Sequence, residues 1–336
     1  MTDPILPPLS RDQRRIAGRE VLRFDHRLAE TGLFTDEALA RLIDGHPREL
    51  VTIRTLRPGA APGEGWIDGA ADGLSGAQLV EAVRTGALWV CVRQALIRDP
   101  SCKAVFEPLM EAFSGQTGVA ARNADGAVVI SSPRMAVPFH VDPAEKMLWH
   151  VRGHKTLMVY PPRTDLLPEA RLEAAVLGGA LSDLPWTPAA EDHALPVSLA
   201  AGQAAYWPRH SPHRVVNDET LNVSISVEFA SPGSRLANAV LYTHGRMRRT
   251  LGWAPPSRGL ARLVSPAYLA LAGALKAWAP LAAGDSPDPA VRFDVDPAAP
   301  DGLRWRDGMA PDWARPAKAR PVRKTARRKA ALLKAA

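Results

Sequence analysis

Residues 127–230 form a succession of short β-rich runs, and this feature constrains the fold of the chain more than any other. The runs are separated by Gly, Pro and Asn residues and read GAVVISS, KMLWHVRG, HKTLMVYPP, LPVSLAAG, QAAYWP, HRVVND and LNVSISVEF. Strands of this length and spacing are typical of all-β sandwiches and barrels, including two-sheet jelly rolls. A helical segment, RTDLLPEARLEAAVLGG, interrupts them, so we predict a β core with an insertion over residues 163–195.

Residues 1–126 have a mixed pattern, which predicts an accessory α/β region beside the main sheet. Apolar runs predict strands over ELVTIRTL and ALWVCVRQAL, and helical spacing predicts helices over TDEALARLID, SGAQLVEAVRTG and PSCKAVFEPLMEAF. We expect Thr35 to cap the first of these helices and Gly86 to end the second. We expect Pro108 to kink or break the third.

Two apolar helices are expected after the β region, within residues 232–284. Their sequences are SRLANAVLYTHGRMRRTLG and SPAYLALAGALKAWAPLA, and they could dock on the core or form a homodimer surface. Lys276 and Pro280 interrupt the second run, which therefore lacks the roughly 18 uninterrupted apolar residues of a membrane span. Residues 285–336, where Pro, Gly, Asp and Arg dominate, are predicted to form a basic tail with little fixed structure.

The net charge of +7 is concentrated at one end of the chain. Residues 301–336 contain eleven Lys or Arg and three Asp, so the first 300 residues carry a net charge of about −1. A chain that is basic throughout would indicate nucleic-acid binding. A neutral body with a basic tail indicates at most weak, non-specific contact with nucleic acid or other polyanions.

Cysteine content indicates the compartment. Cys91 and Cys102 are too few for a disulfide framework, and both are expected to be buried. The N-terminal stretch MTDPILPPLSRDQRR has prolines and charges where a signal peptide has an apolar run. We therefore expect a reducing, cytoplasmic location.

A His-x-Asp tripeptide, His140-Val141-Asp142, lies within the β region. Residues i and i+2 of a strand point to the same face, so the imidazole and the carboxylate are expected in one cavity. A second histidine from a distant strand would complete a set of two histidines and one carboxylate, which holds Fe(II) and leaves positions for O2 and a bidentate co-substrate. His210 and His213 are the two downstream candidates.

The stretch FHVDPAEKMLWHVRGHKTLMVYPP resembles the motif of the JmjC/cupin-like 2-oxoglutarate oxygenases, in which H-x-D is followed by an apolar-x-G-x-K strand and Pro-Pro. The segment GQAAYWPRHSPH resembles the later half of that motif, a turn and an aromatic residue before a proline and a histidine. This resemblance implies a double-stranded β-helix (jelly-roll) core over residues 127–231, within a mainly β protein with accessory helices.

The resemblance also assigns roles to individual residues. The metal ligands are His140, Asp142 and His213, the last lying five residues after Pro208. Lys155, fifteen residues after His140, would bind the distal carboxylate of 2-oxoglutarate. The implied activity is hydroxylation of a C–H bond, coupled to decarboxylation of 2-oxoglutarate to succinate and CO2. Fe(II) is then the cofactor, O2 a co-substrate, and the substrate an unknown protein or small molecule.

The residues around Lys155 indicate that its side chain points inward. Strand alternation places Lys155 on the same face as Leu157 and Val159. A dianionic co-substrate that chelates iron at one end needs a cation at the other. The alternative is a surface lysine with its ammonium group in water.

Several positions depart from the family pattern. Val137 stands where some members have Thr, and Gln203 replaces the Asp of the turn. Glu228 stands where the hydroxylase resembled here has Asn, and its charge would repel bound 2-oxoglutarate unless it is paired. His210 falls where the family often has a large residue, and we expect it to support the metal site rather than to bind metal.

Two other functions fit the same residues. The chain could be a non-enzymatic cupin-like binding or regulatory protein whose basic tail contacts nucleic acid. It could also be a metal-dependent isomerase or hydrolase, which would have no use for Lys155. His150 and His154 have a zinc-like helical spacing, but Gly153 and the β-rich surroundings argue against a helix there.

Overall fold

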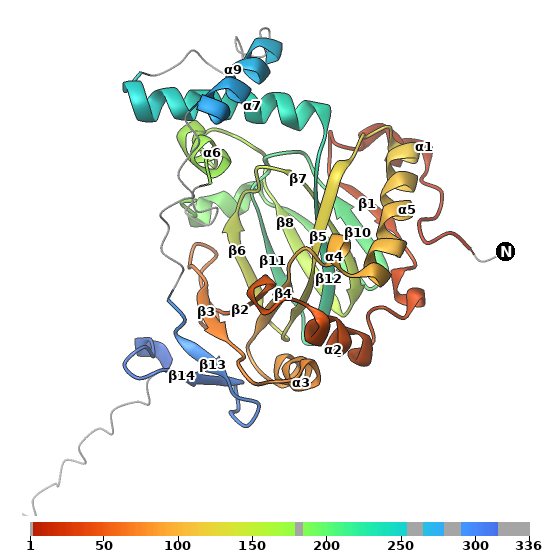
Figure 1. Ribbon diagram of the computed structural model, residues 1–336, viewed down its shortest axis with the longest axis vertical. Coiled ribbons are helices and arrows are strands. Elements are labelled where there is room, and N and C mark those ends of the chain that lie inside the picture. The colour runs from red at the N-terminus through yellow and green to blue at the C-terminus, as the bar shows by residue number, and fades with distance from the viewer. Residues whose placement is uncertain (1–2, 179–183, 254–264, 279–289, 315–336) are drawn as a thin grey trace, which may run out of the picture.

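Two β-sheets face each other at the centre of the computed structural model (Figure 1). The structure describes residues 3–178, 184–253, 265–278 and 290–314. Eight consecutive strands build the facing sheets: β5 (Arg122–Ser131), β6 (Ala136–His140), β7 (Glu145–Arg152), β8 (His154–Val159), β9 (Leu195–Ala200), β10 (Gln203–Tyr206), β11 (His213–Asn217) and β12 (Asn222–Ala230). One sheet contains the order β5-β12-β7-β10, and the other has the order β6-β11-β8-β9. This is the strand order of a jelly roll, or double-stranded β-helix, so the predicted core fold is confirmed.

Alternation along the strands divides the core into two apolar layers. On β7, Met147 and Trp149 belong to the large apolar cluster on the outer face of the main sheet. Leu148 instead belongs to the cluster with Leu157 and Val215, between the two sheets. The side chains at the even positions of β7 therefore face the interior of the jelly roll. Each large apolar side chain buried in these layers contributes roughly 2 kcal/mol to folding.

The N-terminal strands extend the main sheet, so the accessory α/β region predicted for residues 1–126 is continuous with that sheet. At one edge β1 pairs with β10, and beyond β5 the sheet continues through β4, β2 and β3. Helices α2, α3 and α5 cover the outer face of this ten-stranded sheet (Figure 1). The elements of this region are α1 (Arg11–Ile16), β1 (Leu22–Asp25), α2 (Asp36–Gly45), β2 (Val51–Thr55), β3 (Ile67–Ala70), α3 (Gly76–Thr85), β4 (Trp89–Val92), α4 (Ala95–Arg98) and α5 (Pro100–Thr117).

The predicted helix boundaries are largely confirmed. The Thr35 side chain accepts a hydrogen bond from the Ala38 backbone and caps α2, and Gly86 follows the last residue of α3. Pro108 does not break α5, which continues to Thr117. The helix packs Phe106 and Phe113 into the core, and this burial outweighs the roughly 3 kcal/mol that an internal proline costs.

The insertion and the C-terminal helices lie together at one end of the jelly roll (Figure 1). The insertion contains α6 (Glu169–Val176) and a 3-10 turn (Pro188–His193), followed later in the chain by α7 (Pro232–Leu251) and α9 (Ser265–Trp278). Leu177, after α6, packs with Ala239 and Tyr242 of α7 and with Ala272 of α9. The two expected C-terminal helices are present, and α7 bridges α6 and α9.

Part of the expected tail is ordered, which corrects the prediction for residues 285–336. Two strands, β13 (Phe293–Val295) and β14 (Leu303–Trp305), join the edge of the ten-stranded sheet next to β3. Phe293 is fully buried, and its ring lies where a side chain on Gly69 would be. The missing Cβ of Gly69 thus makes room for this strand. Residues 315–336, which contain most of the basic tail, lie outside the described residues.

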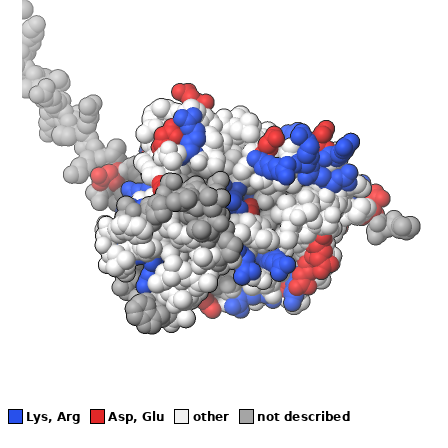
Figure 2. Space-filling model, turned by 90° about the horizontal axis from the view of Figure 1, so that it is seen from above, with Lys and Arg blue, Asp and Glu red and all other residues white. Residues whose placement is uncertain are grey.

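Charged side chains of both signs are scattered over the end of the molecule that carries α7 and α9, among broad uncharged areas (Figure 2). That view has no extended single-sign face over the residues that the structure describes. No helix in the described part of the chain has the length and apolar character to cross a membrane.

Candidate metal centre

The structure brings His140, Asp142 and His213 together at the mouth of the jelly roll. His140 ends β6 and His213 begins β11, and the register of these paired strands places the two histidines opposite each other. The Asp142 Oδ2 atom lies 3.3 Å from His213 Nε2 and 3.8 Å from His140 Nε2, and the two ring centroids are 4.2 Å apart. The three candidate ligand atoms lie within 4.8 Å of one another.

Backbone carbonyls fix the orientation of both imidazoles. His140 Nδ1 lies 2.7 Å from the Pro138 carbonyl oxygen, and His213 Nδ1 lies 3.1 Å from that of Ser211. A carbonyl can only accept, so each Nδ1 carries the ring proton and donates it. The lone pair of each Nε2 is therefore directed at the position facing Asp142, as metal-binding histidines require.

The charges at this position favour a cation. Burial and the neighbouring His213 lower the pKa of His140 to about 4, so the imidazole is neutral at pH 7. Burial alone would raise the pKa of Asp142, but Lys146 and the two imidazoles hold it well below its usual range. Asp142 Oδ2 is buried and has no hydrogen-bond partner among the residues described. Two neutral nitrogens and one carboxylate oxygen are a donor set that fits Fe(II).

Lys146 pairs with the metal-facing carboxylate from the other sheet. Its Nζ atom lies 3.7 Å from Asp142 Oδ1 and 3.3 Å from Glu228 Oε2. Burial lowers the pKa of Lys146, but the two carboxylates more than reverse this effect and raise it. Glu228 is therefore paired, because β7 and β12 place it directly opposite Lys146. The sequence motif does not mark Lys146, and strand alternation is the one sequence signal for its inward position.

Lys155 lies deeper in the same interior. Its side chain is 4% exposed, and no hydrogen bond or ion pair to it is formed within the described part of the chain. Its neighbours across the strands are Asn217 on β11 and Leu199 on β9. Burial without a counterion lowers the pKa of Lys155 to about 7. The predicted inward position of Lys155 is thus observed, and the interior contains an uncompensated cation.

His210 connects the metal centre to α7 without joining the cluster. It adopts a left-handed backbone conformation (φ 62°), and its Nε2 atom lies 3.2 Å from Asn238 Oδ1. The Asn238 amide donates to the carbonyl of Pro143, the residue after Asp142, at 2.8 Å. The pair therefore fixes the chain next to one candidate ligand.

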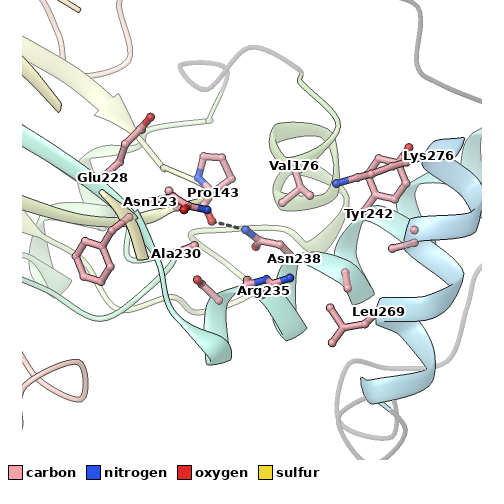
Figure 3. Close-up of a pocket in the computed structure, with 16 residues that line it drawn as sticks. Asn123, Pro143, Val176, Glu228, Ala230, Arg235, Asn238, Tyr242, Leu269 and Lys276 are labelled. Carbon is pink, nitrogen blue, oxygen red and sulfur yellow. Dashed lines mark hydrogen bonds between the residues drawn. The ribbon is translucent and has the colours of Figure 1, made fainter. Parts of the chain in front are cut away.

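A groove of about 560 Å³ opens beside this connection (Figure 3). Pro143 and Glu228 line it at the jelly-roll end, and Tyr242 and Leu269 line it on α7 and α9. A molecule bound in this groove would contact the residue that follows Asp142.

A second histidine–carboxylate cluster joins α6 to α7. Glu169, Glu173 and His244 have potential ligand atoms within 4.8 Å of one another. However, Arg248 donates to both carboxylate oxygens of Glu173, at 2.9 and 3.3 Å, and His244 Nε2 lies 3.1 Å from the hydroxyl of Tyr268. We interpret this cluster as a polar link between helices, because the arginine already neutralises the buried carboxylate.

The zinc-like spacing of His150 and His154 does not correspond to a shared metal site among the described residues. His150 lies on β7 and His154 on β8, on either side of the turn at Gly153, so they are not a helical metal-binding pair. Cys91 and Cys102 are buried as expected, and burial raises their pKa values to about 11 and about 12.

Comparisons with known proteins returned solved structures only. No family model matches the chain, and no curated protein matches it. Escherichia coli ribosomal oxygenase YcfD is 16% identical, with a TM-score of 0.47, over 76% of this chain and 60% of that chain. Its complex with cobalt and 2-oxoglutarate is 16% identical, with a TM-score of 0.44, over 74% and 60%. The lyase for DMSP, DddQ, from Ruegeria pomeroyi is 15% identical, with a TM-score of 0.21, over 32% and 38%. The chain thus spans about 60% of the length of these YcfD chains.

Proposed function

We propose that this chain is an Fe(II)- and 2-oxoglutarate-dependent oxygenase that hydroxylates a C–H bond of its substrate. One observation carries the proposal: three metal-binding side chains and an uncompensated buried lysine share the interior of one jelly roll. The three side chains fit a ferrous ion, and the lysine fits a second anionic group of a ligand that reaches the ion.

His140, Asp142 and His213 would hold the ion from one side, which leaves positions for O2 and for the 2-oxo acid group. When bound, the iron supplies O2 activation coupled to decarboxylation of 2-oxoglutarate to succinate and CO2. Both histidines donate their Nδ1 protons to backbone carbonyls, which leaves each Nε2 lone pair for the ion.

Lys155 would bind the distal carboxylate of the co-substrate. The walls around it are apolar, including Leu148, Leu157 and Leu199. An ion pair in such surroundings is much stronger than one in water, and bulk water has little access to it. The Lys155 ammonium group therefore favours a ligand whose inner end is a carboxylate, because only a paired charge is stable between apolar walls.

The substrate would approach from the groove between the jelly-roll mouth and α7, because that groove contacts Pro143. We also propose a homodimer through α9, where Leu269 and Leu271 are 40% and 44% exposed. Light scattering at micromolar concentration tests this, and a monomer would refute it.

Weak nucleic-acid contact by the basic tail and a cytoplasmic location remain expectations from the sequence.

The test of the proposed function is metal-dependent binding and turnover of 2-oxoglutarate. Protein stripped with EDTA should melt at a lower temperature, and Fe(II) under argon should restore the melting temperature. Adding 2-oxoglutarate should raise it further, because a ligand that binds the folded state stabilises it. Succinate release in air should require both.

His140→Ala should lose the metal-dependent increase, whereas His154→Ala, a matched change outside the cluster, should keep it. A wild-type protein that binds Fe(II) but shows no 2-oxoglutarate response would contradict the proposal and favour an isomerase, a hydrolase or a binding protein. A response that survives His140→Ala would exclude the metal site described here.

A further inference from the structure

A second polar side chain faces the interior beside Lys155. His150 is 0% exposed and occupies an even position of β7, on the interior face with Leu148. His150 on β7 and Lys155 on β8 lie on either side of the turn at Gly153, both side chains are buried, and the charge of Lys155 lowers the pKa of the imidazole. The turn between β7 and β8 creates this proximity. Gly153 has a φ of +84°, and a Cβ there would lie 2.6 Å from the Leu221 carbonyl oxygen, so only glycine fits.

The two ring nitrogens of His150 have different surroundings, and the Gly153 backbone also interacts with the ring. Its Nδ1 atom lies 2.9 Å from Ser224 Oγ, and its Nε2 atom is buried without a hydrogen-bond partner among the described residues. The serine hydroxyl can donate to Nδ1 or accept from it, and the ring proton lies on Nε2 in the tautomer in which the hydroxyl donates. A buried donor without an acceptor costs about 1–3 kcal/mol, so its retention needs a reason.

The other polar neighbour of Lys155 cannot take this role. Asn217, opposite Lys155 on β11, already donates its amide hydrogens to Ser131 Oγ at 2.8 Å and to the Ser132 carbonyl at 2.9 Å. Of these two described neighbours, His150 is therefore the one whose Nε2 remains without a hydrogen-bond partner.

We propose that His150 is a co-substrate-binding residue whose Nε2–H, together with the Lys155 ammonium group, holds the distal carboxylate of 2-oxoglutarate. This inference rests on the proposed function and adds a ligand that the sequence motif does not contain. Ser224 acts as a positioning residue, because its hydroxyl selects the tautomer that donates from Nε2. The Lys155 ammonium group supplies charge but little orientation, whereas a fixed imidazole N–H donates a hydrogen bond in one direction and so orients the carboxylate.

The ionisation of His150 agrees with this role. Burial, and next the charge of Lys155, lower its pKa to about 3, although the Gly153 backbone favours the protonated form. The imidazole is therefore neutral at pH 7 and donates from a single nitrogen. It adds no second charge beside Lys155.

The experiment compares two ligands that differ only at the distal end. Calorimetric titrations with Zn(II)-loaded full-length protein would measure the affinity for 2-oxoglutarate and for 2-oxobutyrate, which has the same chelating end and no distal carboxylate. His150→Leu should lower the affinity for 2-oxoglutarate about tenfold or more and change the affinity for 2-oxobutyrate by less than about twofold. His150→Gln, which retains an amide donor, should recover most of the affinity. Ser224→Ala should lower the affinity for 2-oxoglutarate a few-fold. His154→Leu, the matched control, should bind 2-oxoglutarate with wild-type affinity.

A second measurement needs no variant that must fold. In histidine ¹H–¹⁵N spectra of the Zn(II) protein, the His150 Nε2–H resonance, assigned with His150→Gln, should shift on adding 2-oxoglutarate and not on adding 2-oxobutyrate. The role of His150 alone would be overturned if His150→Leu lowered the affinities for both ligands equally or left both unchanged. It would also be overturned if the Nε2–H resonance did not shift on adding 2-oxoglutarate. Wild-type protein that binds Zn(II) but not 2-oxoglutarate would overturn the proposed function together with it.

Discussion

Two inward-facing lysines of the jelly roll, the half-buried Lys146 and the buried Lys155, differ in the presence of a counterion. Lys146, on β7, lies between Asp142 and Glu228, and these carboxylates raise its pKa. Lys155, on β8, has no ion pair among the residues described, and burial lowers its pKa to about 7.

The difference separates a charge that the fold compensates from one that it leaves for a ligand. Removing a buried lysine that is paired leaves a carboxylate exposed to the low dielectric of the interior, which destabilises the protein. Removing one that is unpaired relieves a desolvation cost. The two substitutions should therefore have opposite effects on stability, and only the second should abolish co-substrate binding.

Lys155→Met should give the largest effect. We expect the affinity for 2-oxoglutarate to fall at least about 100-fold, because a charge-assisted contact in an apolar pocket is lost. The ligand-free protein should become more stable by on the order of 2 kcal/mol at pH 7, since no ammonium group has to be desolvated. Calorimetry and urea unfolding measure the two quantities. Unchanged affinity would show that Lys155 is an incidental buried cation.

Lys146→Met should change the stability of the metal-free protein in the opposite direction. Asp142 then loses its closest cation, and we expect the metal-free protein to lose about 2 kcal/mol of stability. Urea unfolding with and without Zn(II) checks this, because the metal replaces the missing positive charge and should reduce the loss. If Lys146→Met stabilised the metal-free protein as Lys155→Met is expected to, the contrast between the lysines would not hold.

The pH dependence of 2-oxoglutarate binding follows from the pKa of Lys155. Above pH 7 the free protein has lost the Lys155 proton and must regain it to bind the anion, so affinity should fall by up to about tenfold per pH unit. Over the same range ligand-free stability should rise, because the unfolded lysine, with a pKa of 10.5, keeps a proton that the folded one releases.

Titrations in buffers of different ionisation enthalpy would detect the proton uptake. Lys146→Met should retain it, and Lys155→Met should not. A pH-independent affinity between pH 7 and pH 9 would mean that Lys155 stays protonated in the free protein.

Glu228→Gln should have the smallest effect. The Glu228 side chain is 51% exposed, so its pair with Lys146 contributes less than about 1 kcal/mol. We expect urea unfolding and 2-oxoglutarate affinity to stay close to wild type. A gain of more than about tenfold in affinity would mean that the glutamate repels the co-substrate despite its pairing with Lys146.

The sequence alone predicted the parts that depend on local periodicity. Short β-rich runs predicted the core strands, the His-x-Asp tripeptide predicted that His140 and Asp142 share a cavity, and the resemblance to the JmjC/cupin-like motif selected His213 over His210. The structure brings these three side chains together. The alternation around Lys155 predicted its inward side chain. The Lys155 prediction succeeds because a strand of period two fixes which face a side chain takes, whatever lies opposite. Asp142 lies two residues beyond the end of β6, so strand alternation does not explain its position.

Tertiary structure decided which residues face each other across the strands. The register of β7 and β12 gives Lys146 its partner Glu228, and the corner at Gly153 brings His150 close to Lys155. Likewise, the buried ring of Phe293 packs over Gly69, more than 200 positions earlier. Through this contact a segment expected to be a tail forms a strand of the sheet. Compensation of a charge depends on distances in space, which local periodicity does not contain.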